Sequence, residues 1–200
     1  MSTLYTYKHL GADTAHGEEH RSLEEGFDKL DSRERLCKAK LFPSAPAFVG
    51  GIVAVQSEMG GFSTMRFQNT LPQSSAAAQI QVYRGYGNGA ALEVTWVPEV
   101  VPVGTMNIVV DYTFILARAG LALGVFSTTI QRTYTVPSTV LVQRDRVPID
   151  GIVPRADDIL GIVITRRSDL AGDTYDGLAT RRLHIIEASV MLQGADGEDV

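Results

Sequence analysis

From about residue 62 to residue 192, apolar and polar positions alternate along the chain with a period of two. This alternation is typical of β-strands that bury one face and expose the other. In residues 106–117, for example, Ile108, Val110 and Tyr112 fall on one face together with Phe114. No helical pattern interrupts the strands, so the sequence predicts an all-β, antiparallel β-sandwich of jelly-roll type rather than an α/β fold. The predicted strands are residues 62–68, 78–84, 91–96, 106–117, 127–136, 140–143, 149–153, 159–164 and 183–192.

The inward-facing apolar residues of these strands are predicted to form the core of the sandwich. Turn residues separate the strands, including a glycine pair at residues 60–61. The run RGYGNG at residues 84–89 is rich in glycine, but a strand follows it where a phosphate site needs a helix N-terminus. We therefore expect a hairpin loop there. The predicted core residues are Leu92, Val94, Trp96, Ile108, Val110, Tyr112, Ile162 and Ile164.

The first fifty residues differ in composition from the rest and are predicted to form an N-terminal arm, partly helical or extended. Ser22 and Glu25 fit a helix capping box. Leu23, Phe27 and Leu30 recur at helical spacing, which predicts one short helix with an apolar face.

Beyond this helix, apolar residues alternate with lysines in CKAKL at residues 37–41, a pattern equally typical of a short strand. At the other end of the chain, the segment GADGEDV is small and acidic, and is predicted to be disordered. The predicted organisation is an arm at residues 1–50, a jelly-roll sandwich at residues 51–193 and an acidic tail at residues 194–200.

Charge is distributed unevenly along the chain. All the lysines lie in the first forty residues, and residues 51–143 carry only four arginines and four acidic residues. A surface normally mixes charges of both signs densely, so this segment is expected either to contact other protein subunits or to expose neutral Ser, Thr and Gln side chains. The net charge of −5 argues against nucleic-acid binding. No stretch has the ~18 apolar residues of a membrane-spanning helix, so we expect a soluble protein that is made in a cytoplasm and has no membrane partner.

Candidate residues for catalysis or metal binding are few. The string HGEEH at residues 16–20 matches the inverted zincin pattern, with His9 as a conceivable third ligand. Zinc hydrolysis also needs a walled cleft, which this polar region does not supply, so a solvated helix start is the preferred interpretation. Cys37 is the single cysteine, which excludes a disulfide framework, and it is interpreted as an inert thiol.

Two further patterns are candidate sites. His184 lies in an apolar strand and is expected to be a hydrogen-bonded core or edge residue rather than a base. Asp169, Asp173 and Asp176 lie within eight residues and offer part of a calcium site, although aspartate is also a common turn residue. The sequence therefore predicts a protein that is not an enzyme, with no catalytic residue, cofactor or resident metal.

A family resemblance rests on two stretches of the sandwich region. The first comprises residues 91–96 (ALEVTW) and 104–112 (GTMNIVVDY). The second comprises residues 156–167 (ADDILGIVITRR), the loop at 173–177 (DTYDG) and the strand at 183–190. Together they resemble the jelly-roll virion proteins of tailed bacteriophages, over about residues 62–192. Two departures are notable: Val109 and Val110 stand where that family often carries a second Trp, and residues 1–50 have no counterpart.

The resemblance implies a virion structural protein, commonly a homotrimer, that serves as a capsid decoration protein, a head fibre or part of a tail fibre. The main hypothesis is a decoration protein on the outer capsid surface, assembled in the host cytoplasm, with itself and the major capsid protein as partners. The arm would then grip the shell through Leu23, Phe27 and Leu30. The alternative is a tail-associated or receptor-binding carbohydrate-binding sandwich that uses Tyr83, Tyr86 and Asn88.

Overall fold

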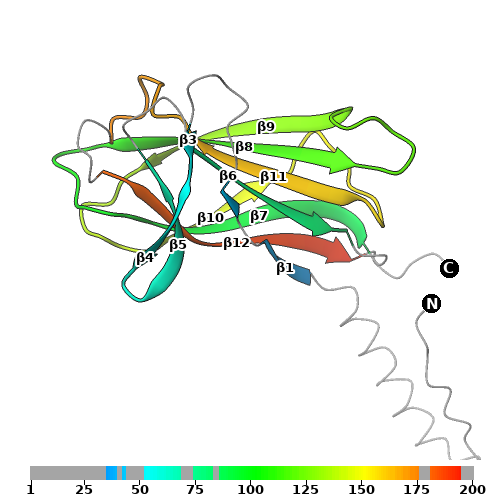
Figure 1. Cartoon of the computed structure of the whole chain (residues 1–200), viewed down its shortest axis with the longest axis horizontal. Helices are drawn as coiled ribbons and strands as arrows, with labels where there is room; N and C mark the ends of the chain where they lie inside the picture. The colour runs from blue at the N-terminus through cyan, green and yellow to red at the C-terminus, as the bar shows by residue number, and fades with distance from the viewer. Residues whose placement is uncertain are drawn as a thin grey trace, which may run out of the picture.

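Twelve β-strands make up the described part of a computed structural model, which covers residues 35–39, 42–43, 52–68, 74–82, 86–175 and 181–194 (Figure 1). The strands are β1 (Arg35–Ala39), β2 (Phe42–Pro43), β3 (Ile52–Val53), β4 (Val55–Met59), β5 (Phe62–Phe67), β6 (Ser74–Gln81), β7 (Tyr86–Pro98), β8 (Asn107–Ala117), β9 (Phe126–Thr135), β10 (Gln143–Pro148), β11 (Ile159–Arg166) and β12 (Leu183–Gly194).

The strands form two sheets that pack face to face. The first sheet has the order β10-β7-β12-β5-β4, with β1 also paired to β12. The second has the order β2-β6-β11-β8-β9, with β3 also paired to β6. Every pairing is antiparallel except that of β3 with β6. In Figure 1 the second sheet lies above the first.

The pairing of the eight strands from β5 to β12 is nested. β8 pairs with β9, β7 with β10, β6 with β11 and β5 with β12. A long antiparallel ribbon that is rolled up across two sheets produces this order, and it defines a jelly roll. The predicted all-β jelly-roll sandwich is therefore confirmed.

The core lies between the two sheets and contains all eight residues predicted for it. Leu92, Val94, Trp96, Ile108, Val110, Tyr112, Ile162 and Ile164 are each no more than 3% exposed. The prediction succeeds because strict alternation places every second side chain on the buried face of a strand.

Two details of the predicted strand pattern are wrong. Residues 149–153 form no strand, and the only strand near 140–148 is β10, whose inward positions include the polar residues Gln143 and Asp145. An edge strand of this kind carries no apolar alternation to detect.

The predicted hairpin at 84–89 is also wrong, because β7 already begins at Tyr86 and β6 and β7 belong to different sheets. The turn at residues 60–61 is present, with positive φ at both glycines, and it joins β5 to β4, a strand that was not predicted.

Part of the range assigned to the N-terminal arm lies in the sheets. β1 pairs with residues 188–192 of β12, and β2 pairs with β6. The strand interpretation of residues 37–41 therefore applies to most of that stretch. The predicted short helix lies outside the described residues, and so do residues 195–200 of the predicted tail.

Candidate functional site

Most of the side chains predicted to bind partners or ligands lie outside the described part of the chain. This holds for Leu23, Phe27 and Leu30 of the arm, for the HGEEH string and for Tyr83. Tyr86 and Asn88 are placed in β7, but their side chains are outside the described set. These assignments therefore remain predictions.

Two of the three aspartates of the candidate calcium site, Asp169 and Asp173, pair with arginines, and Asp176 lies outside the described residues. Asp173 accepts two hydrogen bonds from Arg166, Nε to Oδ2 at 3.0 Å and Nη2 to Oδ1 at 2.9 Å. Asp169 pairs with Arg167 at 2.9 Å, and Arg167 also reaches Asp111 at 2.6 Å. Among the described residues there is no group of three or more side chains suited to hold a metal ion. These two carboxylates serve ion pairs inside the protein, which the loop sequence alone did not reveal.

Arg166 joins the loop after β11 to the neighbouring strands. Its Nη1 donates to the Arg181 carbonyl at 2.8 Å, and its guanidinium lies 5.7 Å from the centroid of the Tyr175 ring. Tyr175 in turn donates its hydroxyl to the Val100 carbonyl at 2.6 Å and accepts the Val100 N–H at 3.0 Å. Asp173 and Tyr175 of the DTY motif thus form buried structural contacts with Arg166 and Val100.

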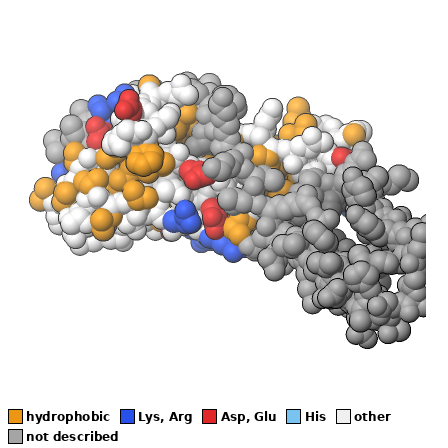
Figure 2. Space-filling view, turned by 90° about the horizontal axis from the view of Figure 1, so that it is seen from below, with side chains coloured by type: hydrophobic (Ala, Val, Ile, Leu, Met, Phe, Trp, Pro, Cys, Tyr) orange, Lys and Arg blue, Asp and Glu red, His pale blue; other side chains and the backbone are white. Residues whose placement is uncertain are grey.

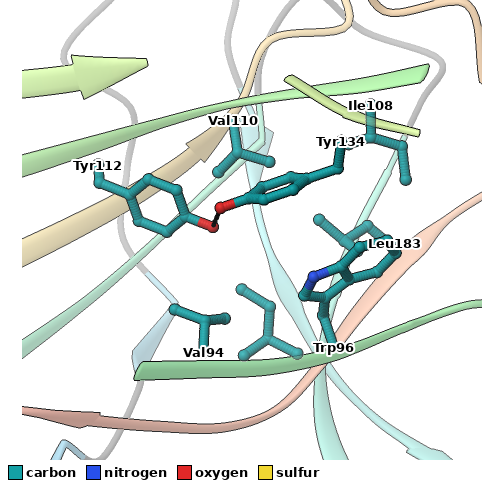
Figure 3. Close-up of a pocket in the computed structure, with 8 residues that line it drawn as sticks. Val94, Trp96, Ile108, Val110, Tyr112, Tyr134 and Leu183 are labelled. Carbon is teal, nitrogen blue, oxygen red and sulfur yellow. Dashed lines mark hydrogen bonds between the residues drawn. The ribbon is translucent and has the colours of Figure 1, made fainter. Parts of the chain in front are cut away.

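A cluster of aromatic side chains lies near the side of the sandwich where β9 and β10 form the sheet edges (Figure 3). The Tyr112 and Tyr134 hydroxyls point toward each other and lie 3.0 Å apart. The Trp96 ring packs 5.5 Å from the Tyr134 ring, and its Nε1 donates to Asp145 Oδ2 at 2.5 Å. Trp96 and Tyr112 are buried, whereas Tyr134 and Asp145 are half-buried. We call Trp96, Tyr112, Tyr134 and Asp145 the aromatic cluster.

The electrostatics of the aromatic cluster favour neutral tyrosines. Burial raises the pKa of Tyr134 to about 12 and that of Tyr112 well above its ordinary value. The negative charge of Asp145 adds to both shifts, and the positive charge of Arg132 opposes them. The side chains enclose a narrow apolar space too small to admit a water molecule. A ligand could therefore reach only the outer rim of the cluster, at Tyr134 and Asp145.

Sequence reasoning placed Trp96 and Tyr112 in the core but did not single out Tyr134 or Asp145. One signal was present: Tyr134 continues the even-numbered face of β9 that Phe126, Thr128 and Ile130 also occupy. Nothing local indicates that Asp145 meets Trp96, 49 residues away, because that contact depends on the pairing of β10 with β7.

Loops at one end of the sandwich expose large apolar side chains. The loop from β7 to β8 and the loop from β9 to β10 both lie at this end, and Val136 N donates to the Met106 carbonyl between them. Figure 2 shows hydrophobic side chains gathered at the same end, on the left of the view. We call the exposed residues of these two loops, each 42–77% exposed, the apolar end: Val101, Val103, Val140, Leu141 and Val142.

The charge-poor segment thus has two kinds of surface. Ten of the twelve large apolar side chains exposed in the described part of the chain fall within residues 51–143. The outward positions of β9, by contrast, are neutral and polar, namely Ser127, Thr129, Gln131, Thr133 and Thr135. The neutral polar surface is therefore present on β9, whereas contact with other protein subunits remains a prediction.

His184 is buried and hydrogen-bonded, as expected. Its Nδ1 lies 2.9 Å from the Thr64 hydroxyl, and its Nε2 lies 3.4 Å from Glu99 Oε2. Burial lowers the pKa of His184, the hydrogen bond to Glu99 opposes that shift, and the positive charges of Arg66 and Arg182 add to it. The imidazole is therefore held neutral inside a polar group on the outer face of the first sheet.

Comparison with solved structures finds carbohydrate-binding domains and a phage tailspike domain, all at low identity. A carbohydrate-binding module, TmCBM61, solved with β-1,4-galactotriose, has 13% identity and a TM-score of 0.32, covering 82% of this chain and 90% of that one. The xylan-binding domain CBM22-2 of Paenibacillus barcinonensis Xyn10C has 11% identity and a TM-score of 0.39, covering 79% and 91%. The enzymatically active domain of tailspike protein 4 of bacteriophage CBA120 has 8% identity and a TM-score of 0.36, covering 80% of this chain but 19% of that one.

These values establish neither a shared site nor a shared ligand, and the jelly-roll assignment stands on the strand pairing of this chain. No protein-family model and no curated protein sequence matches the chain. Within the described residues, no helix is long and apolar enough to cross a membrane.

Proposed function

We propose that this chain is a non-enzymatic structural subunit of a tailed-phage virion, a capsid decoration protein that binds the outer shell as a homotrimer. The observation that carries the proposal is the apolar end, where two adjacent loops expose valine and leucine side chains within a charge-poor segment. A patch of this kind marks a protein-binding surface. The resemblance to phage virion proteins, carried by residues 91–96, 104–112, 156–167, 173–177 and 183–190, supplies the biological setting.

Burial of the apolar end supplies the binding energy in this proposal. Transfer of a Val or Leu side chain out of water contributes about 1.5–3 kcal/mol when it is fully buried. A trimer presents three such ends, so contacts that are modest singly add up when all three bind at once. The arm, through Leu23, Phe27 and Leu30, adds a second contact with the shell.

Substitution of the apolar end tests the proposal. The variant V103S/L141S changes one exposed residue in each loop, and L121S/L123S is the matched control at the loop between β8 and β9, where both leucines are also exposed. We expect V103S/L141S to bind undecorated capsids at least about tenfold more weakly, since each 1.4 kcal/mol is tenfold. Equal binding by wild type and V103S/L141S in a co-sedimentation assay would overturn the assignment.

The arm is tested by a truncation that respects the sheets. Removal of residues 1–34 leaves β1 and β2 in place, whereas a longer deletion would remove strands that pair with β12 and β6. We expect the truncated protein to fold and to form the same oligomer, but to bind capsids more weakly. Undiminished capsid binding would show that the arm does not grip the shell.

A second candidate function is carbohydrate binding by a tail-associated or receptor-binding protein. The half-buried Tyr134 ring favours it, because the Asp145 carboxylate and the Arg132 guanidinium act on this ring from nearby. A partly exposed aromatic ring flanked by hydrogen-bonding groups suits the face and hydroxyls of a sugar. A glycan array with wild type and Y134A distinguishes the two functions: saturable binding lost in Y134A supports this candidate, and no binding removes it.

A further inference from the structure

The outer face of the first sheet carries two arginines around His184. Arg66 of β5 lies directly opposite His184 of β12 in the antiparallel register. Arg182 precedes His184 by two residues, which makes it a diagonal neighbour of Arg66 on the same face. Two guanidinium groups are thus brought within reach of one imidazole, and both act on it electrostatically.

Among the described residues, Glu99 is the carboxylate that acts on His184, and its two oxygens are shared between His184 and Arg182. Glu99 lies 3.3 Å from Arg182 Nη1 through Oε1 and 3.4 Å from His184 Nε2 through Oε2. Thr64 occupies the other imidazole nitrogen. With the imidazole neutral, two positive charges and one negative charge leave the group with an excess charge of +1.

The Nε atom of Arg66 is left without an acceptor. This nitrogen is buried, and within the described residues it is the one buried side-chain nitrogen or oxygen atom that has no hydrogen-bond partner. A buried donor that makes no hydrogen bond raises the free energy of the folded state. Native proteins almost always supply an acceptor for it from the chain, from water or from a bound ion. The excess positive charge at this place favours an acceptor that is negative.

We propose that Arg66 and Arg182 bind an oxyanion, a sulfate, phosphate or carboxylate group, on the outer face of the first sheet beside His184. The free Nε and the neighbouring Nη of Arg66 form a planar fork that suits two oxygens of such a group. Arg182, whose side chain is about a quarter exposed, supplies the second positive charge. The site is separate from the apolar end and does not rest on the proposed function.

Titration with inorganic anions tests the site. Sodium sulfate, sodium phosphate and sodium acetate are added separately at constant ionic strength set with sodium chloride, and the Nε–Hε resonance of Arg66 is followed by NMR. We expect a saturable shift with at least one oxyanion that chloride does not reproduce. A shift that stays linear, or none with any of the three, would overturn the proposal.

Variants separate this site from general attraction to a positive surface. R66Q and R182Q each remove one proposed ligand, and their response is read on the amide resonances of residues 64–67 and 183–185. R144Q is the control, because Arg144 is an exposed arginine on β10 at the far edge of the same sheet. Loss of the saturable shifts in R66Q and R182Q, with R144Q unchanged, is the expected result. An equal loss in R144Q would show non-specific screening.

His184 provides a second readout that a merely structural role of Arg66 would not give. Arg66 lowers the pKa of His184, so an anion that offsets its charge should raise that pKa. We expect sulfate to raise the pKa of His184 in wild type and in R144Q. In R66Q the pKa of His184 should already be raised, and sulfate should no longer change it. The same sulfate effect in R66Q and wild type would contradict the assignment.

Discussion

Arg166 and Asp173 form a two-point ion pair in which both side chains are completely buried. Asp173 Oδ2 also accepts the Val109 N–H at 3.3 Å, so the pair fastens the loop after β11 to the start of β8. The Thr174 and Tyr175 N–H groups add two bonds to the Asn107 carbonyl at the same place. This end of the jelly roll is therefore held by polar contacts inside the protein.

Replacement of Asp173 should strongly destabilise the fold. The substitution D173N keeps the shape of the side chain but leaves the buried Arg166 charge without its counter-ion, which costs about 3–5 kcal/mol. Urea unfolding followed by the fluorescence of Trp96, the single tryptophan, measures the free energy of unfolding. D169N is the control, because the Asp169 carboxylate is 25% exposed and its partner Arg167 keeps Asp111. Its expected cost is about 0–1 kcal/mol, and equal effects of the two variants would refute the argument.

Alanine should be tolerated less well at Gly151 than at Gly104. Both glycines have positive φ, +82° and +77°, so alanine costs about 1 kcal/mol or more at either position from the backbone alone. A Cβ at Gly151 would also lie 3.1 Å from Thr128 Oγ1, whereas a Cβ at Gly104 meets nothing within 4 Å. Thermal unfolding of G151A and G104A compares them. In a T128A background the extra cost at Gly151 should disappear; if it persists, the contact is not its cause.

The stability of the protein should fall in alkaline solution because of Tyr134. Burial raises the pKa of Tyr134 to about 12, above the value of an exposed tyrosine. The folded state therefore holds this proton when the unfolded state has lost it, so stability is fully present below pH ~10 and declines as the pH rises toward 12. Urea unfolding at pH 9, 10 and 11 should show a shallower decline for Y134F than for wild type. Parallel curves would mean that Tyr134 does not contribute.

Acidification should weaken the fold through His184. Burial, aided by Arg66 and Arg182, lowers the pKa of His184 below its ordinary value of 6.5. The unfolded state then takes up a proton that the folded state resists, so stability is fully present above pH ~6.5 and is lost as the pH falls through the lowered pKa. Free energies of unfolding at pH 7.5, 6.5 and 5.5 should fall less for H184Q than for wild type. An identical slope would exclude His184 as the cause.

The sequence by itself determined the fold class and the core. Alternation along residues 106–117 and 91–96 placed Ile108, Val110, Leu92 and Val94 inside, because one-sided burial imprints a period of two on a strand whatever its partners are. The neutral surface of β9 and the glycine turn at residues 60–61 were also visible, because each depends on residues that are neighbours in the chain.

Only the tertiary structure decided which distant residues meet. Trp96 and Asp145 are 49 residues apart, and Thr64 and His184 are 120 apart. Each pair forms because the rolled antiparallel ribbon brings particular strands into register, and that register follows from the packing of both sheets at once. The same register explains why Asp173, in a loop whose aspartates suggested a calcium site, forms a buried ion pair with Arg166. Local patterns fix which face of a strand is buried, but the partners of a polar side chain are chosen by contacts that no local pattern contains.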